Sequence, residues 1–570
     1  MKIFKISVKV LVFGIAMLSM ASCADKLTEL NQNPNGIDPA TANPNQLLPT
    51  VMTAAAGDYL RLGYGEVGGT VQHTQKDGWY DSHNHYNWSP RDWTNWYNML
   101  RNNEFLRKRS TELGYKFHEG VSYAMRGFIF GTITDLWGDA PYSEALQGNL
   151  SNDLLKAKFD SQEAIYAGVI ADLKKASELF ATKDVAGLAP NYDVFYGGNP
   201  ERWQKFVNTL LLRYYMRISS KKEAEAKAGI EAVYSSGIYI KTAAEDATMS
   251  FVGSSSGNSW PDATQFDLAE SGWRRIKGGK PLVDQLNQTN DPRLKVWFSP
   301  VHVQWVVDRT IDTPTGADPF IRKDGVLQNN VPYLTEIELR AEITKGHKFT
   351  RHYNPDRIAS TLKIDTARYV GVEVGIDEPS VYNYNPNPGQ QVENQHVSQL
   401  APVYRNSSGG VLRARLASAS ETSFILAEAA LKGWNVGAAA GHYEAAIKNS
   451  LDTWGVGSTY AEFIDHPGVK FNNTLEQLIT QKWIASWTAA TESWFDYRRT
   501  GLPDFKAGPV APQVVLPVRF IYGDNELNYN ADNFDAAVEK LETNTYTNAR
   551  GKNSQWSKSW LIQGTGKPWQ

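Results

Sequence analysis

The sequence predicts a mainly α protein that carries large aromatic-rich loops on one side. Apolar residues recur at helical spacing over about residues 46–240 and again over about residues 415–500. Between them, about residues 240–415 are rich in Gly, Ser, Asn, Pro and isolated Trp. A structureless loop of that length is improbable inside a compact domain, so we expect short helices and hairpins there. The expected organisation is a single domain over residues 46–570, with a helical scaffold and a loop-rich insert.

Three segments of the first half support the helical scaffold. Residues 121–138, "VSYAMRGFIFGTITDLWG", place apolar side chains on one helix face. Ser161 is a suitable N-cap for a second helix, whose apolar stripe begins at Ile165. Residues 199–219, "NPERWQKFVNTLLLRYYMRIS", form the third amphipathic segment.

Helical spacing resumes in the second half as a pair. Residues 421–434, "ETSFILAEAALKGW", are followed after a short connection by residues 438–455, "AAAGHYEAAIKNSLDTWG". Small residues at the crossing and aromatic residues at the ends are typical of a tetratricopeptide-type hairpin. No clean repeat of about 34 residues runs through the chain, so the repeats are expected to be degenerate.

The N-terminus has the pattern of a lipoprotein export signal. Lys2, Lys5 and Lys9 precede the apolar run "VLVFGIAMLSM", which is too short to span a bilayer. The small residues Ala21 and Ser22 follow the run, and then comes Cys23, the only cysteine of the chain. We predict a signal peptide over residues 1–22, lipidation of Cys23 and a tether over residues 23–45. The alternative is plain secretion with an incidental cysteine, and Met20, where Leu is commonest, departs from the lipobox pattern.

The composition excludes some classes of partner and indicates another. A net charge of −3 and 21% charged residues give no sign of nucleic-acid binding or of an anionic membrane surface. The chain has 18 Trp, 27 Tyr and 22 Phe, more aromatic residues than a helical core normally uses. Some of these rings are therefore expected to face solvent and to bind a ligand.

The densest aromatic cluster lies in residues 77–104, "DGWYDSHNHYNWSPRDWTNWYNMLRNNE". Its second half predicts a helix with Ser89 as N-cap and Pro90 at the first position. Trp93, Trp96, Tyr97 and Leu100 then share one face and are expected in the core.

The first half of the cluster has the composition of a sugar site. Flat rings stack on the apolar face of a pyranose, and short polar side chains bond its hydroxyl groups. The candidate ligand-binding residues of this cluster are Trp79, Tyr80, Asp81, His83 and Trp88.

Two tryptophans of the loop-rich middle, Trp260 and Trp273, extend the set of candidates. The residues alone leave open whether the tryptophans of either region are exposed or buried.

A metal site is the alternative interpretation of "DSHNHY". Asp81, His83 and His85 alternate, so on an extended segment they would share a face and could ligate zinc. No further ligand is identifiable, and hydrogen bonding of these side chains is the favoured interpretation. We predict no metal site and no cofactor, and the sequence leaves open whether calcium orders a loop.

Six stretches together resemble the SusD/RagB family of outer-membrane lipoproteins. They occur in order along essentially the whole mature chain, and the Asn-rich N-terminus and the Trp cluster near residue 79 are similar to its SusD-like branch. The stretches are "DLWGDAPYSEAL" at 135–146, "WQKFVNTLLLRYYMRIS" at 203–219, "NDPRLKVWFSP" at 290–300, "ETSFILAEAALKG" at 421–433, "ESWFDYRRTGLP" at 492–503 and "LPVRFIYGDNELNYN" at 516–530.

The resemblance implies a fold and a role. The implied fold has four tetratricopeptide-like helix pairs and a loop-rich side that carries ligand contacts. The implied role is that of a lipid-anchored protein on the outside of the outer membrane, which captures oligosaccharides for a SusC-like TonB-dependent transporter and is not an enzyme. A peptide ligand is the first alternative. A secreted glycoside hydrolase is a remote one, since it needs a pair of carboxylates that sequence cannot show.

Charged residues inside these motifs also have structural interpretations. Asp135 and Asp139 are expected to act in turn and cap chemistry rather than as a catalytic pair. Arg498 and Arg499 are expected to pair with Asp496 or another buried acid rather than to bind an anion. Arg293, in an Asp-Pro turn, is expected to clamp a loop.

Overall fold

The computed structural model describes residues 42–148, 150–389, 394–547 and 550–569. The predicted signal peptide, Cys23 and nearly all of the predicted tether lie outside these residues. Among the residues described, no helix combines the length and the apolar character that crossing a membrane requires.

Helices dominate the first half, which confirms the mainly α prediction. Successive helices pack on one another, from α2 against α5 through α8 against α9. The elements up to residue 250 are α2 (Pro44–Tyr64), α3 (Glu66–Thr70), β1 (Thr74–Lys76), α4 (Asp81–Asn84), α5 (Thr94–Leu113), α6 (Lys116–Trp137), β2 (Ala140–Pro141), β3 (Phe159–Asp160), α7 (Gln162–Ala181), α8 (Pro200–Ile218), α9 (Glu223–Ser236) and β4 (Ala247–Ser250).

Short elements follow, and the described helices between α9 and β10 have nine residues or fewer. Four strands form one sheet in the order β6-β9-β7-β8, with β6 parallel to β9 and the other pairs antiparallel. The elements are α10 (Ser271–Arg275), β5 (Ile276–Gly278), α11 (Lys280–Gln288), α12 (Leu294–Trp297), β6 (Val303–Val307), β7 (Arg322–Lys323), β8 (Val326–Leu327), α13 (Glu336–Thr344), β9 (Phe349–Tyr353) and β10 (Arg413–Ala417).

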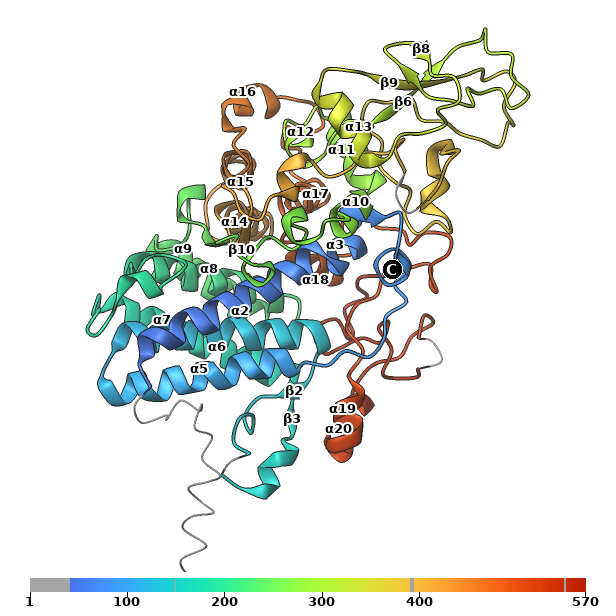
Figure 1. Cartoon of the computed structure of the whole chain (residues 1–570). Helices are drawn as coiled ribbons and strands as arrows, with labels where there is room; N and C mark the ends of the chain where they lie inside the picture. Colours follow the sequence, from blue (N-terminus) through green and yellow to red (C-terminus); the bar gives the residue numbers. More distant parts are fainter. Residues whose placement is uncertain (1–41, 149, 390–393, 548–549, 570) are drawn as a thin grey trace, which may run out of the picture.

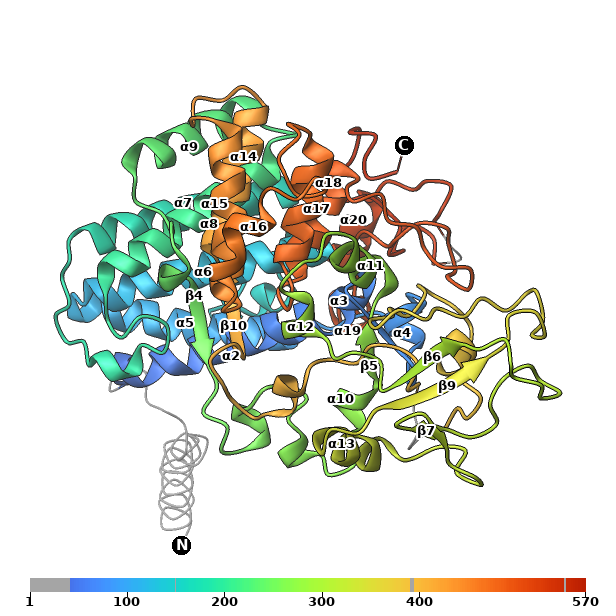
Figure 2. The ribbon, with the colours of Figure 1, turned by 90° about the horizontal axis from the view of Figure 1, so that it is seen from above.

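Longer helices return after β10. The helix α14 packs on α15, on α17 and on α8 of the first half, so the two helical parts meet. The β6–β9 sheet lies at the opposite end of the molecule from α5 and α7 (Figures 1 and 2). The last elements are α14 (Ala419–Leu431), α15 (Ala439–Thr453), α16 (Tyr460–Phe463), α17 (Leu475–Ala485), α18 (Thr491–Thr500), α19 (Asp524–Tyr529) and α20 (Ala531–Glu539).

Side chains cap the starts of α2, α7, α8, α13, α14 and α17. The Ser161 side chain accepts a hydrogen bond from the Ala164 amide at 3.2 Å and caps α7, as predicted. The predicted start of α5 at Ser89 and Pro90 is wrong. Arg91 instead forms a bridge with Tyr522, and Asp92 accepts the Thr94 amide at 2.6 Å, so the helix begins at Thr94.

The predicted core face of α5 is confirmed in large part. Trp93, Trp96 and Leu100 are buried. Tyr97 is only half-buried, and its hydroxyl donates to the carbonyl oxygen of Pro141 at 2.6 Å.

Two buried groups of ion-paired side chains join five helices, and the charge of Arg217 in one group also acts on Asp496 in the other. We call the two groups together the ionic network. Its acids and bases alternate in space, so each charge faces an opposite one. Its members are Asp135 of α6, Arg213 and Arg217 of α8, Glu421 and Glu428 of α14, Lys482 of α17, and Glu492, Asp496, Arg498 and Arg499 of α18.

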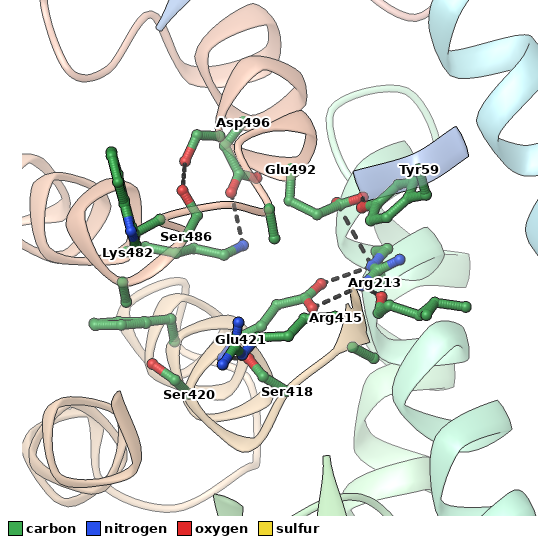
Figure 3. Close-up of a pocket in the computed structure, with 17 residues that line it drawn as sticks. Tyr59, Arg213, Arg415, Ser418, Ser420, Glu421, Lys482, Ser486, Glu492 and Asp496 are labelled. Carbon is green, nitrogen blue, oxygen red and sulfur yellow. Dashed lines mark hydrogen bonds and ion pairs between the residues drawn. The ribbon is translucent and has the colours of Figure 1, made fainter. Parts of the chain in front are cut away.

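The contacts of the ionic network are close. Arg213 Nε lies 2.6 Å from Glu421 Oε1, and Arg217 Nη2 lies 2.5 Å from Glu492 Oε2. Figure 3 shows the part of the network around a cavity of about 40 Å³, where Lys482 Nζ lies 2.7 Å from Asp496 Oδ2. Nearly every ionic group that lines this cavity already has a partner of opposite charge, so the cavity is part of the core.

Among the charged motif residues, Arg499 and Asp139 have the roles that the sequence predicted, and Asp135 does not. Arg499 pairs with Asp496 at 2.8 Å and also with Glu428, as expected of a structural arginine. Asp139 accepts the Gln162 amide at 2.8 Å, which confirms a capping role. Asp135 does not cap: its Oδ1 lies 3.2 Å from Arg217 Nε, inside the ionic network, so the prediction for Asp135 is wrong.

Arg293 is fully buried and clamps its turn as predicted. Its Nη2 lies 2.6 Å from Asp291 Oδ2, and its Nη1 donates to Ser450 Oγ of α15 at 2.7 Å. The Asp-Pro turn is thereby tied to the helix pair α14–α15.

Close helix packing predicts opposite effects of two glycine substitutions. A Cβ at Gly131 of α6 would lie 2.0 Å from the buried Tyr214 hydroxyl, whereas a Cβ at Gly441 of α15 would meet nothing within 4 Å. We expect Gly131→Ala to lower the free energy of unfolding by about 1–3 kcal/mol through overpacking. Gly441→Ala should raise it by about 0.5–1 kcal/mol. Urea unfolding followed by circular dichroism measures both, and equal effects would contradict the packing described.

The ionic network predicts a large cost for removing one acid. Glu492→Gln leaves Arg217 and Arg213 short of a buried partner and should lower the free energy of unfolding by about 3–5 kcal/mol. Glu201→Gln removes an exposed contact with Lys183 and should leave the unfolding midpoint unchanged.

The pH dependence of Glu492→Gln follows from the same charges. Burial alone would raise the pKa of Glu492, but Arg213 and Arg217 outweigh it and hold this pKa below the usual 4.5. The ionised carboxylate therefore stabilises the fold above pH 4.5, and that contribution is lost as the pH falls further. Stability measured from pH 7 to 3 should fall less steeply in the variant than in the wild type. Parallel curves would contradict this role of Glu492.

Candidate functional site

Pairing of β1 with β5 positions the predicted aromatic site. Thr74 opposes Gly278 and Lys76 opposes Ile276 in an antiparallel pair. This pairing places residues 77–88 beside α10, nearly 200 positions further along the chain. The loop after β1 therefore rests on two segments that lie far apart in the sequence.

Polar contacts fix the backbone around this loop. The Asn84 side chain accepts the Lys76 amide at 2.9 Å and donates to the Lys76 carbonyl oxygen at 2.8 Å. His83 Nε2 lies 3.1 Å from Thr74 Oγ1. A Cβ at Gly69 of α3 would lie 2.5 Å from the His83 ring, so this glycine permits the close approach.

Trp79 is the exposed aromatic residue at the centre of the site. Its side chain is 71% exposed, and its backbone φ is +54°, a left-handed conformation that non-glycine residues adopt rarely. The guanidinium carbon of Arg275 lies 3.6 Å from the centre of the ring. Since Arg275 itself is only 5% exposed, one ring face rests on a buried cation and the other remains open to solvent.

Tyr80 and Asp81 lie directly beside Trp79. The half-buried Tyr80 ring packs edge-on against His85, with centroids 5.1 Å apart. Asp81 is exposed, and its Oδ1 lies 3.5 Å from His85 Nδ1. Partial burial and the charges of Asp377, Asp81 and Glu378 raise the pKa of Tyr80. The structure therefore brings Trp79, Tyr80 and Asp81 together on the surface, where a ligand could reach them.

Two predicted ligand residues of the same cluster are buried, and their prediction is corrected. His83 is 3% exposed and bonds Thr74. Trp88 is 4% exposed, with its ring edge-on against Trp494 and Phe520. Both side chains fasten the loop to the core and do not line its surface.

The two tryptophans of the loop-rich middle are also buried and are corrected in the same way. Trp260 is 1% exposed and packs against Tyr64 at 4.9 Å and Tyr404 at 5.8 Å between ring centres. Trp273 is 1% exposed, with the guanidinium groups of Arg340 and Arg405 over its ring. Short helices bury little apolar surface of their own, so large rings supply the core of this part.

The alternating Asp81, His83 and His85 do not converge as the metal alternative required. Residues 81–84 form the helix α4 instead of an extended segment. His83 bonds Thr74, whereas His85 Nε2 lies 2.8 Å from the carbonyl oxygen of Ile376. Within the described ranges, no three His, Cys, Asp or Glu side chains gather as metal ligands would.

Three site residues were missed by sequence reasoning. Arg275 supports Trp79 only because β1 pairs with β5, and nothing in the sequence near either strand predicts that pairing. Asp377 and Glu378 reach Tyr80 from a loop nearly 300 positions away in the sequence. The only available signal was their place in a polar loop before Pro379.

The chain matches a known protein family. A family model described as starch-binding and associating with the outer membrane matches residues 39–309 and 357–523. No curated protein matches the chain.

Among solved structures, a SusD homologue from Bacteroides fragilis is 18% identical, with 92% of this chain and 99% of that chain covered and a TM-score of 0.67. A SusD-like protein from Bacteroides thetaiotaomicron is 20% identical, with 91% and 98% covered and a TM-score of 0.64. A chitin-binding protein is 21% identical, with 92% and 100% covered and a TM-score of 0.68. These likenesses confirm the expected fold class of degenerate helix pairs with a loop-rich side.

The burial of the tryptophans predicts which of them the fold needs. Trp260→Ala leaves a cavity among Tyr64 and Tyr404 and should lower the free energy of unfolding by about 3–5 kcal/mol. Trp79→Ala removes an exposed ring and its contact with Arg275 and should lower it by about 1 kcal/mol or less. Urea unfolding of both variants tests this difference. A stable Trp260→Ala variant would restore Trp260 as a candidate for ligand contact.

Proposed function

Because the chain belongs to the SusD-like family of starch-binding proteins that associate with the outer membrane, we propose that it binds oligosaccharides at the cell surface and delivers them to a SusC-like TonB-dependent transporter. In this proposal Cys23 carries the lipid anchor on the outer face of the membrane, and Trp79, Tyr80 and Asp81 hold the ligand. The ligand is transferred without any bond being made or broken.

The observation that carries the proposal is the exposed ring of Trp79 on a rigid support. Its free face suits the apolar C–H face of a pyranose, because such stacking removes apolar surface from water on both partners. Arg275 occupies the other face, so the ring accepts one sugar unit rather than being enclosed between two. A ring that is already held in place loses little conformational entropy on binding.

Polar groups beside the ring supply the hydrogen bonds that a sugar needs. Asp81 offers carboxylate oxygens to sugar hydroxyl groups, and the Tyr80 hydroxyl can donate or accept. One of the structurally similar proteins is a chitin-binding protein, which supports a saccharide ligand for this fold. We expect modest affinity, because a single stacked ring and a few hydrogen bonds form the contact.

The proposal predicts that Trp79 dominates glycan affinity. In calorimetry against a panel of plant, fungal and host oligosaccharides, Trp79→Ala should weaken the best ligand by about tenfold or more, the loss of roughly 1.4 kcal/mol. Phe105→Ala, on the distant helix α5, removes another exposed aromatic ring and should leave the affinity unchanged. Unaltered binding by Trp79→Ala would contradict the site.

The same panel separates the alternatives. Peptide mixtures included in it should show no binding that depends on Trp79, and peptide binding in the absence of glycan binding would favour the peptide alternative. Release of reducing ends from the bound glycan by the purified protein would show hydrolysis and would overturn the proposal of a binding protein.

A further inference from the structure

Three exposed carboxylates lie near Tyr80, which together with its neighbour Trp79 we call the platform. Asp81 follows Tyr80 in the chain, and Asp377 and Glu378 belong to the loop before Pro379. His85 connects the two segments, because its Nε2 lies 2.8 Å from the carbonyl oxygen of Ile376 and its Nδ1 lies 3.5 Å from Asp81 Oδ1. All three charges act on the Tyr80 phenol.

The loop that carries Asp377 and Glu378 is held in place by neighbouring segments. The Gly375 amide donates to Gln75 Oε1 of β1 at 3.2 Å, and the Gly375 carbonyl oxygen accepts from the Val510 amide at 3.1 Å. The Pro379 carbonyl oxygen accepts from Asn394 Nδ2 at 3.1 Å. Hydrogen bonds on both sides therefore fix the backbone that carries the two carboxylates.

The cations near the platform do not neutralise these acids. Within the ranges that the structure describes, neither Lys nor Arg lies within ion-pair distance of Asp81, Asp377 or Glu378. Arg275 is buried beneath the Trp79 ring, and the Lys76 charge interacts with Asp262. The exposed charge beside Tyr80, the neighbour of Trp79 in the chain, is therefore negative.

We propose that this acidic rim selects the class of sugar: the platform takes neutral or amine-bearing saccharides and disfavours uronic or sulfated ones. The proposal rests on the proposed function, since it concerns the same site. A neutral sugar gains hydroxyl-to-carboxylate hydrogen bonds, and an ammonium group gains charge attraction as well. An anionic group within a Debye length of three carboxylates is repelled, and the effect weakens as salt is added.

Collisional quenching of Trp79 tests the charge around the ring without any sugar. Among the described tryptophans, only Trp79 is more than about a third exposed. The fluorescence of Trp79 is obtained by subtracting the signal of the Trp79→Phe variant from that of the wild type. This fluorescence is then quenched with caesium and with iodide at low salt. We compare the wild type with the triple variant Asp81→Asn/Asp377→Asn/Glu378→Gln. A control triple variant, Glu178→Gln/Glu201→Gln/Glu223→Gln, removes the same charge from exposed positions of the scaffold.

The rim variant should be quenched less by caesium and more by iodide, each on the order of threefold at low ionic strength, and the difference should vanish in high salt. The control variant should match the wild type. The proposal is overturned, whatever the protein binds, if the caesium constant of the rim variant equals that of the wild type and the iodide constants of the two proteins are also equal.

A matched set of ligands tests the selection itself. β-1,4-linked hexamers of glucose, glucosamine and glucuronic acid share a backbone and differ in charge. Binding through Trp79 should be weakest for the glucuronic acid hexamer by about tenfold or more, and the rim variant should abolish that difference. Equal or tighter binding of the acidic hexamer by the wild type would overturn the proposal.

The two tests also separate this proposal from the proposed function. Charge-dependent quenching together with no glycan binding anywhere in the panel would reject the function and leave the acidic rim established. Glycan binding through Trp79 without charge discrimination would reject the rim and leave the function intact.

Discussion

The ionic network of α6, α8, α14, α17 and α18 is the constraint on which the rest of the structure depends. A charge that is buried without a partner costs several kcal/mol, so each member is stable only where the others place an opposite charge beside it. Arg499 satisfies this condition with Glu428 of α14 and Asp496 of its own helix. The residues that meet here come from motifs that lie more than 300 positions apart, and their mutual dependence fixes how the two helical parts pack.

The position of the surface site follows from this packing. The helices α17 and α18 belong to the network, and each also contacts the chain near the site. The Trp483 indole donates to the Val71 carbonyl oxygen at 2.8 Å, just before β1, and Trp494 packs edge-on against Trp88, just after α4. The segment between these contacts carries Trp79, Tyr80 and Asp81. A buried charge network thus holds both ends of the loop that presents the exposed ring.

Sequence reasoning predicted the scaffold well and the site in part, for physical reasons. Helical spacing and capping depend on neighbours in the chain, so the helix α7 with its cap Ser161 could be predicted from local sequence. The helix α5 was placed too early because the bridge between Arg91 and Tyr522 depends on residues more than 400 positions away. The sequence left the exposure of Trp79 and Trp88 open, and the structure places Trp79 at the surface and Trp88 in the core although both lie among short polar residues. Exposure of a ring in a loop is decided by distant partners such as Trp494 and Arg275.

The abundance of aromatic residues has two causes, and only one concerns a ligand. The segment between α9 and β10 has short helices and small strands, which bury little apolar surface, so rings such as Trp260 and Trp273 fill its interior. The number of aromatic residues in a loop therefore does not by itself indicate a binding site. Trp79 combines three features: a left-handed backbone, a cation stacked on one face, and an open second face. The buried Tyr86 shares the first and the buried Trp273 the second, so the open face is what distinguishes Trp79 from the core rings. A backbone in that conformation costs about 1–3 kcal/mol and persists only where its surroundings enforce it, as the contacts of Arg275 and Asn84 do here. A fold that maintains such a conformation around an exposed ring gains nothing in stability from the exposure, and the ligand contact that we propose for Trp79 would give a physical reason for it.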